Sequence, residues 1–203
     1  VSRKSIVIHN AVLVDAKYVG KWRCERNAIV SVGRLCEQKN FEMLIDAFHE
    51  LPEEFNNYKL EIYGEGPLRD RLQKKIDSLN LTNRAFLMGS TNEIHSRIMN
   101  ARLFVLSSNY EGMPNVLLEA MAIGIPCIST DYSPEGSVNE IMDHGYNGFI
   151  VERGNPFELS KQIYSIMGNN EILQRISVNA INSCNVYNKK TIYNKWESYL
   201  TNA

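Results

Sequence analysis

Hydrophobic residues follow two different periods along the chain, and the two periods alternate. Six short apolar or β-branched runs predict strands, over residues 28–32, 59–63, 85–88, 103–106, 126–129 and 148–151. Polar or glycine-rich turns and stretches with helical spacing separate most of these runs, as in βαβ units that build a parallel sheet. The pattern therefore predicts an α/β protein, a Rossmann-like three-layer α/β/α domain with a parallel sheet of about six strands.

The predicted helices have apolar faces and recognisable starting points. The first places Phe41, Leu44, Ile45 and Phe48 at i, i+3, i+4 and i+7. Further helices are predicted over 68–79, 92–100, 155–167 and 188–200, and from residue 114 onwards. Proline is favoured as a first helical residue because the helix makes no use of the N–H that it lacks. The chain offers it at Pro67, Pro114, Pro134 and Pro156.

Two sequence signals support the predicted helices over 155–167 and 188–200. Asn155 and Glu158 have the spacing of a capping box, which predicts a helix start. Tyr193, Trp196 and Leu200 form one apolar stripe of the final helix, which is therefore amphipathic.

The loops that follow the strands are rich in glycine and charge. Open parallel sheets bind ligands outside the carboxyl ends of their strands. In this chain the loops at that edge are residues 33–34, 64–66, 89, 107–115 and 131–137. Glycines there let backbone approach a ligand, so the edge suits a small molecule that carries phosphate.

Composition excludes several classes of partner. The formal net charge is -1 over 203 residues, so nothing attracts the chain globally to nucleic acid. The four cysteines lie at positions 24, 36, 127 and 184, without a CxxC pair or a His-paired spacing. We expect reduced thiols, no disulfide and no metal site. The longest apolar run, 120–128, is far shorter than the ~20 residues that span a bilayer, and nothing resembles a signal peptide. Because the chain begins with valine, we expect a piece of a longer protein.

A basic pair follows the first predicted strand. Arg34 comes directly after Gly33, and Lys39 stands near the start of the next helix. A guanidinium and an ammonium at a helix N-terminus suit a diphosphate, because free N–H groups already point outward there. The alternative is that both are solvated surface charges.

A second glycine loop follows the second strand. Gly64 and Gly66 belong to "GEGP", which lacks the spacing of G-x-G-x-x-G because Arg69 stands where the third glycine would be. This disfavours a hydride-transfer site. A tight turn explains most of the stretch, and we expect the loop to border the ligand.

Two carboxylates stand eight positions apart in "EGMPNVLLEA". If Pro114 begins the helix, Glu119 lies inside it while Glu111 stays in the preceding loop. At ~1.5 Å of rise per residue the two are on the order of 10 Å apart, too far to share a proton. We expect them to grip different parts of one elongated ligand through hydroxyl groups. The alternative for Glu119 is an exposed helix residue, which the apolar residues around it disfavour.

Four stretches together resemble the C-terminal, donor-binding domain of retaining GT-B glycosyltransferases, in particular glycosyltransferase family 4. These are "VGRLCEQKNFEMLIDAF", "LEIYGEGPLRDRL", "FLMGS" and "EGMPNVLLEAMAIGIPCISTD". The resemblance covers nearly the whole chain and implies one half of a GT-B fold. It implies an interdomain segment over 1–26, a nucleotide-sugar-binding domain over 27–185 and a C-terminal helix over 186–203 that packs toward an N-terminal domain.

The resemblance also implies roles for named residues. Arg34 and Lys39 would neutralise the diphosphate of the donor, and Glu119 would hold its ribose hydroxyls. Glu111 would face the donor sugar and act with Arg34 and Lys39 in catalysis. Backbone around Gly33, Gly64 and Gly66 would border the ligand. The base would lie near Met88 and Gly89. The remaining residues of the loop before the helix would face the sugar and the distal phosphate; these are Gly112, Met113, Pro114 and Asn115.

The implied reaction is the transfer of a sugar, with retention, from a UDP- or GDP-sugar to a glycan or lipid-linked acceptor. No cofactor and no metal is expected, because the nucleotide-sugar is a substrate and cations with a helix N-terminus can stabilise the leaving group. The acceptor would bind through an N-terminal domain. The implied setting is cell-surface polysaccharide synthesis in the cytoplasm, compatible with peripheral association of the full-length enzyme at the inner face of the membrane.

Other readings of the resemblance differ in class. One alternative is a separate, non-catalytic nucleotide-sugar-binding subunit that needs a partner chain for activity. A third is half of a sugar-nucleotide epimerase or of a glycan phosphorylase. The context of the two glutamates disfavours the epimerase, and the phosphorylase is disfavoured because the sequence has no recognisable lysine motif for a pyridoxal cofactor.

Overall fold

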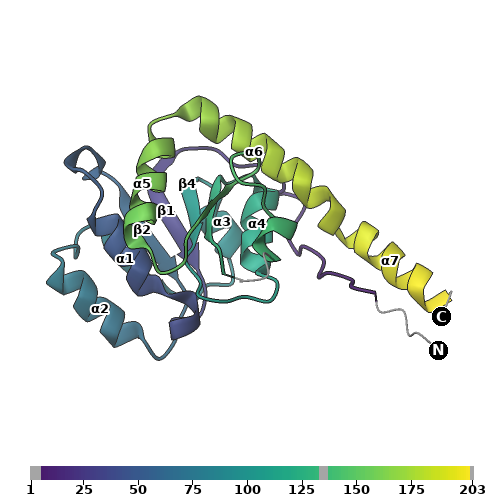
Figure 1. Cartoon of the computed structure of the whole chain (residues 1–203), viewed down its shortest axis with the longest axis horizontal. Coiled ribbons are helices and arrows are strands. Elements are labelled where there is room, and N and C mark those ends of the chain that lie inside the picture. The colour runs from purple at the N-terminus through teal and green to yellow at the C-terminus, as the bar shows by residue number, and fades with distance from the viewer. Residues whose placement is uncertain (1–5, 133–136, 202–203) are drawn as a thin grey trace.

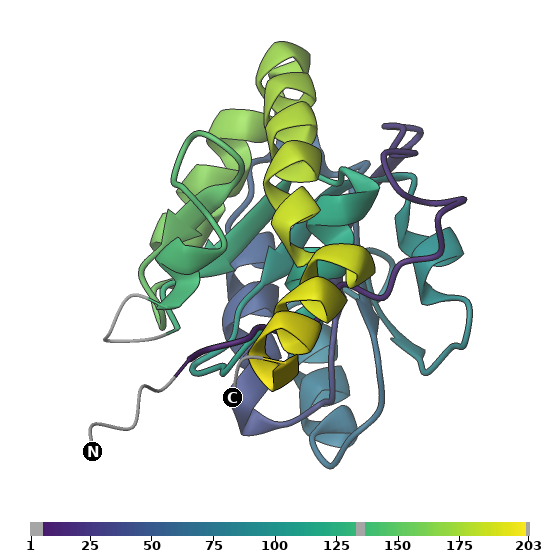
Figure 2. The same ribbon diagram turned by 90° about the vertical axis from the view of Figure 1, so that its right-hand side faces the viewer.

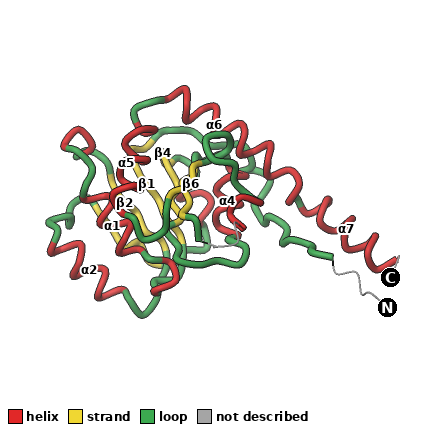
Figure 3. The backbone as a smooth tube through the Cα atoms, in the orientation of Figure 1, coloured by secondary structure: helices red, strands yellow, loops and turns green. Residues whose placement is uncertain are grey.

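A single parallel sheet lies between two layers of helices (Figure 1 and Figure 3). The structure is a computed structural model that describes residues 6–132 and 137–201. The strands are β1 (Arg26–Val32), β2 (Lys59–Tyr63), β3 (Ala85–Gly89), β4 (Ala101–Leu106), β5 (Cys127–Thr130) and β6 (Phe149–Val151). They are arranged in the order β3-β2-β1-β4-β5-β6, and every pair is parallel. The prediction of an α/β fold with a six-stranded parallel sheet is confirmed.

Alternation along the strands decides which helices cover which face. The helices are α1 (Phe41–His49), α2 (Arg69–Ser78), α3 (Ile94–Ile98), α4 (Asn115–Ile123), α5 (Pro156–Met167), α6 (Asn170–Cys184) and α7 (Lys189–Thr201). Ile29 of β1 lies in a core with α1, α2 and α5, whereas its neighbours Ala28 and Val30 lie in a second core with α3 and α4. Helix α6 contributes to both, through Ile176 to the first and Ala180 to the second.

Helix α6 was not predicted, although its sequence carries a helical pattern. Its buried face consists of Leu173, Ile176, Ser177, Ala180 and Cys184. These residues have regular helical spacing, so the sequence contains the signal for this helix and the prediction missed it.

The predicted helix starts are partly correct. Pro156 is the first residue of α5, and the Asn155 side chain accepts a hydrogen bond from the Glu158 backbone N–H, as predicted. Pro114 is instead the residue before α4. Pro67 lies in the turn before α2. Pro134 lies outside the described residues.

A buried charged network ties β1 to β2 on the second face. The Glu61 carboxylate accepts hydrogen bonds from Arg26 Nη1 at 2.7 Å and from the Tyr63 hydroxyl at 2.9 Å. Burial, and then the hydrogen bond to Glu61, raise the pKa of Tyr63 to about 12. Each buried polar group here has a partner, so the network fixes the strand pair instead of offering a free acid.

Glycines 64 and 66 allow the loops after β1 and β2 to touch through their backbones. A Cβ on Gly64 would lie 1.9 Å from the Gly33 carbonyl oxygen, and the residue has a φ of +139°. A Cβ on Gly66 would lie 2.4 Å from the Leu35 carbonyl oxygen. The glycines of "GEGP" therefore have a structural reason within the fold, namely close packing of two loops.

We predict that Gly64→Ala destabilises the domain by about 3 kcal/mol or more, because backbone must move and the residue keeps a strained φ. The measurement is urea unfolding followed by circular dichroism. Gly168→Ala is the control, since nothing lies within 4 Å of its added Cβ, and a change within about 0.5 kcal/mol is expected. Equal stability of the two variants would contradict the packing argument.

Candidate functional site

The order of strands places a topological switch point at the carboxyl ends of β1 and β4. The chain continues from β1 to β2 and β3 on one side and from β4 to β5 and β6 on the other. The loops that leave β1 and β4 therefore diverge at this topological switch point, where open α/β sheets bind their ligands. The loop after β1 carries Gly33, Arg34 and the 3₁₀ turn Glu37–Lys39, and the loop after β4 runs through residues 107–114.

Hydrogen bonds join these two loops into one surface. The Asn109 backbone N–H donates to the Gln38 carbonyl at 2.7 Å, and the Ser107 hydroxyl donates to the Lys39 carbonyl at 2.8 Å. The Asn40 side chain donates to the Asn109 amide oxygen at 2.9 Å while it also caps the first turn of α1. The backbone around Lys39 is consequently fixed from both sides.

An ion pair between Lys39 and Glu111 lies at the centre of this junction. Lys39 Nζ is 2.5 Å from Glu111 Oε1, and the two side chains are only 15% and 8% exposed. The Ser108 hydroxyl donates to the same oxygen at 2.7 Å, and Gln38 Nε2 donates to Oε2 at 3.3 Å. Both oxygens of Glu111 are thus already engaged inside the protein.

The lysine reaches this carboxylate across Gly33. A Cβ on Gly33 would lie 2.9 Å from Lys39 Cε, so the missing side chain makes room for the lysine stem. An ammonium has three N–H donors, and Glu111 is the single hydrogen-bond partner of Lys39 Nζ among the described residues. Two donors of Lys39 therefore remain for a ligand.

The two loops also carry a cationic side chain and lead to N–H groups that have no partner in their own helix. Arg34 is exposed, and within the described ranges its side chain has no hydrogen bond or ion pair. Helix α4 begins after Pro114, which provides no side-chain cap, so the first N–H groups of α4 lack an acceptor from their own helix. Space around Gly112 is open, since nothing lies within 4 Å of a Cβ added there.

Glu119 lies inside α4 and pairs with a residue to which sequence analysis gave no role. His95 Nε2, from α3, is 3.2 Å from Glu119 Oε2, and the side chains are 17% and 21% exposed. Helix α4 buries six of its nine residues, as its apolar sequence predicts. Glu119 and Glu111 therefore have separate partners, in agreement with the expectation that they do not share a proton.

The other predicted residues extend the same edge of the sheet. The Gly64 N–H donates to the Gly89 carbonyl at 2.9 Å, which joins the loops after β2 and β3. Met88 is 47% exposed at the end of β3. Met113 is half-buried and Asn115 is exposed at the start of α4. Residues 133–136 of the loop after β5 lie outside the described residues.

Lys39 and Glu111 were candidate residues from the sequence, but the other residues that hydrogen-bond to the two glutamates were not. Ser108 stands three residues before Glu111, a local spacing that could have indicated the hydrogen bond. Gln38 and His95 are 73 and 24 residues away from the carboxylates they contact, so no local pattern connects them.

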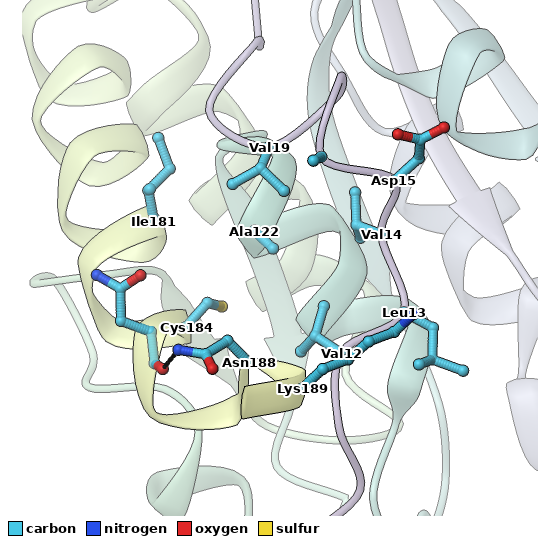
Figure 4. Close-up of a pocket in the computed structure, with 12 residues that line it drawn as sticks. Val12, Leu13, Val14, Asp15, Val19, Ala122, Ile181, Cys184, Asn188 and Lys189 are labelled. Carbon is cyan, nitrogen blue, oxygen red and sulfur yellow. Dashed lines mark hydrogen bonds between the residues drawn. The ribbon is translucent and has the colours of Figure 1, made fainter. Parts of the chain in front are cut away.

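One groove lies away from these residues. Figure 4 shows a groove of about 650 Å³ between segment 12–19 and the helices α4, α6 and α7, with Val12, Val19 and Ile181 on its walls. None of the predicted site residues lines it, and we assign the candidate site to the switch point because the charged groups gather there. Within the described ranges, no helix is long and apolar enough to cross a membrane. The same residues hold no cluster of three or more His, Cys, Asp or Glu side chains placed for a metal ion.

The matching family model and a curated relative of this chain are both of glycosyltransferases. A family model described as "Glycosyl transferases group 1" matches residues 17–183. A Bacillus subtilis poly(glycerol-phosphate) alpha-glucosyltransferase is 28% identical over 172 residues, which cover 85% of this chain and 25% of that protein. The chain spans 25 to 54% of the lengths of the first curated relatives that it matches.

Two solved structures are similar over most of the chain. A mutant of S. aureus TarM, in complex with Fondaparinux, alpha-GlcNAc-glycerol and UDP, is 25% identical with a TM-score of 0.79, covering 95% of this chain and 37% of TarM. The C-terminal domain of a glycosyl transferase group 1 family protein from Francisella tularensis is 21% identical with a TM-score of 0.69. That match covers 87% of this chain and 93% of the domain, and it shows the shared fold.

We predict a strong energetic coupling between Lys39 and Glu111, because removing either one leaves a poorly solvated charge. Urea unfolding of Lys39→Met, Glu111→Gln and the double variant should give a coupling free energy of about 1–3 kcal/mol. The exposed pair Arg97 and Glu93 is the control, for which coupling within experimental error is expected. Additive effects at Lys39 and Glu111 would show that the pair is not a structural unit.

Proposed function

Since this chain belongs to the glycosyl transferases group 1 family, we propose that it is the donor-binding domain of a retaining glycosyltransferase. In this proposal a nucleoside-diphosphate sugar binds at the switch point between β1 and β4. The sugar would pass to a glycan or lipid-linked acceptor in cell-surface polysaccharide synthesis. The Bacillus subtilis relative is named for glucosylation of poly(glycerol-phosphate), which supports a polymer as the acceptor.

The observation that carries the proposal is the anchored cation at the switch point. The Lys39 ammonium pairs with Glu111, and the lysine stem packs against Gly33. The ammonium still keeps two N–H donors. A diphosphate placed there would meet a cation that needs no reorganisation to bind it. Such preorganised charge is the main means by which proteins stabilise a developing anion.

Two further groups suit the same diphosphate. Arg34 is a free guanidinium that can take two phosphate oxygens at once. The uncapped N-terminus of α4 adds N–H donors and a partial positive charge. During transfer the bond between the sugar C1 and the phosphate oxygen breaks, and the leaving nucleoside diphosphate gains negative charge that these three groups would stabilise.

The structure changes the role that we propose for Glu111. Its two oxygens already accept hydrogen bonds from Lys39, Ser108 and Gln38. A carboxylate used in this way is better suited to anchoring Lys39 than to holding a sugar hydroxyl directly. We therefore propose that the sugar lies against the open surface around Gly112, and that Glu111 acts through the lysine.

The nucleoside would extend from the diphosphate toward Glu119 and the end of β3. Glu119 Oε1 has no hydrogen-bond partner among the described residues and would accept the ribose hydroxyls. Met88 and Gly89 would border the base. The sequence leaves uracil, guanine and adenine open as the base, and the UDP bound in the similar TarM structure favours uracil.

We also propose that segment 1–26 and α7 connect the domain, over residues 27–185, to a second domain that binds the acceptor. Helix α7 projects beyond the body, with residues 6–14 running beside it (Figure 1 and Figure 2). Its Tyr193, Trp196 and Leu200 are 63%, 46% and 70% exposed. The predicted stripe is therefore available to a second domain.

We predict that Arg34→Ala lowers the affinity for UDP at least tenfold, because a charge-assisted bidentate contact contributes about 1.5–3 kcal/mol. Stability should not change, since Arg34 contacts nothing that the fold needs. Isothermal titration calorimetry with UDP and GDP measures the effect. Arg23→Ala removes an exposed charge elsewhere and is the control, with unchanged affinity expected.

Two outcomes would contradict the proposed function. One is that the folded, unsubstituted chain binds neither UDP nor GDP. The other is that Arg34→Ala and Arg23→Ala bind the nucleotide equally well, which would move the diphosphate away from the switch point.

For α7 we predict that Trp196→Ser leaves the unfolding temperature of this chain unchanged but lowers that of a chain that also carries the proposed second domain by several degrees. The reason is that Trp196 would be buried only when a second domain is present. Differential scanning calorimetry of both proteins, with and without the substitution, makes the comparison. An equal shift in the two proteins would mean that the stripe is not an interdomain surface.

A further inference from the structure

A histidine from a separate helix holds the carboxylate to which we assign the ribose. His95 lies on α3 and Glu119 on α4, and their side chains meet at 3.2 Å between Nε2 and Oε2. Both side chains are about four-fifths buried. A hydrogen bond at this depth loses little to competing water, so it can fix the rotamer of the glutamate.

The contact occupies only one side of the carboxylate. Oε2 accepts a hydrogen bond from His95, while Oε1 has no hydrogen-bond partner among residues 6–132 and 137–201. A glutamate has three rotatable bonds, and an unsupported one would lose that freedom when it binds a ligand. With His95 in place, Oε1 is directed before the ligand arrives.

The imidazole is itself positioned by its surroundings. The ring of Tyr18 packs edge-on against it, with centroids 5.9 Å apart and an interplanar angle of 62°. Tyr18 comes from the segment that precedes β1 and is partly buried against the second core. Three separate parts of the chain therefore converge on the orientation of one carboxylate.

We propose that His95 is a positioning residue for nucleotide recognition, which directs Glu119 so that its free oxygen accepts the 2′- and 3′-hydroxyls of a ribose. This inference rests on the proposed function, because it takes Glu119 as the ribose ligand. It assigns to His95 an effect on the ribose alone, and none on the diphosphate or the base.

The test compares two probes that differ only in the ribose hydroxyls, UDP and 2′,3′-dideoxy-UDP, by isothermal titration calorimetry. The unsubstituted chain should prefer UDP. His95→Ala should weaken UDP binding by about tenfold and leave dideoxy-UDP binding unchanged, which reduces the preference. His95→Gln should restore most of the preference, because its amide Nε2 can donate to Glu119 in place of the imidazole.

Two further variants test whether His95 acts through Glu119. Glu119→Gln should reduce the preference by itself, and adding His95→Ala to it should cause no further loss. His49→Ala removes an exposed histidine at the end of α1 and should leave both affinities unchanged. Circular dichroism melting of each variant separates loss of recognition from loss of fold.

The outcomes that overturn the inference are distinct from those that overturn the proposed function. If Glu119→Gln reduces the preference and His95→Ala does not, His95 has no positioning role while the ribose assignment stands. Equal weakening of both probes by His95→Ala also excludes an action through the ribose. If Glu119→Gln leaves the preference intact, the ribose assignment and this inference are both wrong.

Discussion

The ion pair between Lys39 and Glu111 is the interaction on which the candidate site depends. It joins the loops that leave β1 and β4, the two strands between which the chain reverses its direction across the sheet. Hydrogen bonds through Asn109 and Ser107 also join these two loops, and the ion pair adds the link that fixes the charged side chains. The pair fixes a cation at the switch point, and the energetic cost of orienting that cation is met during folding instead of during binding.

The glycines of the loops and the Glu119 carboxylate are also arranged during folding. Gly33 makes room for the lysine stem, and Gly64 lets the neighbouring loop pack against the Gly33 carbonyl, so a chain of close contacts runs along the edge of the sheet. Glu119 is held by His95 in the way that Lys39 is held by Glu111. In each case one polar group is satisfied inside the protein so that another is presented outward in a fixed direction.

The sequence predicted the sheet because alternation and helical spacing are local properties of short segments. It also singled out Arg34, Lys39, Glu111 and Glu119 as candidate site residues, from their places in the loops after β1 and β4 and on α4 and from the family resemblance. It could not reveal how they pair. Gln38 and His95 reach their carboxylates through the packing of distant segments. Helix α6 was missed although its buried residues have helical spacing. The glycines that were expected to border the ligand also serve loop packing.

The central claim is that the anchored lysine at the switch point receives the diphosphate of a nucleotide. A crystal structure of this chain grown with UDP tests it most directly. The account predicts the diphosphate within hydrogen-bonding distance of Lys39 Nζ and of the first N–H groups of α4, with the contact between Lys39 and Glu111 retained. A nucleotide bound instead in the groove between segment 12–19 and α6, or a lysine that leaves Glu111 to reach the phosphate, would contradict it.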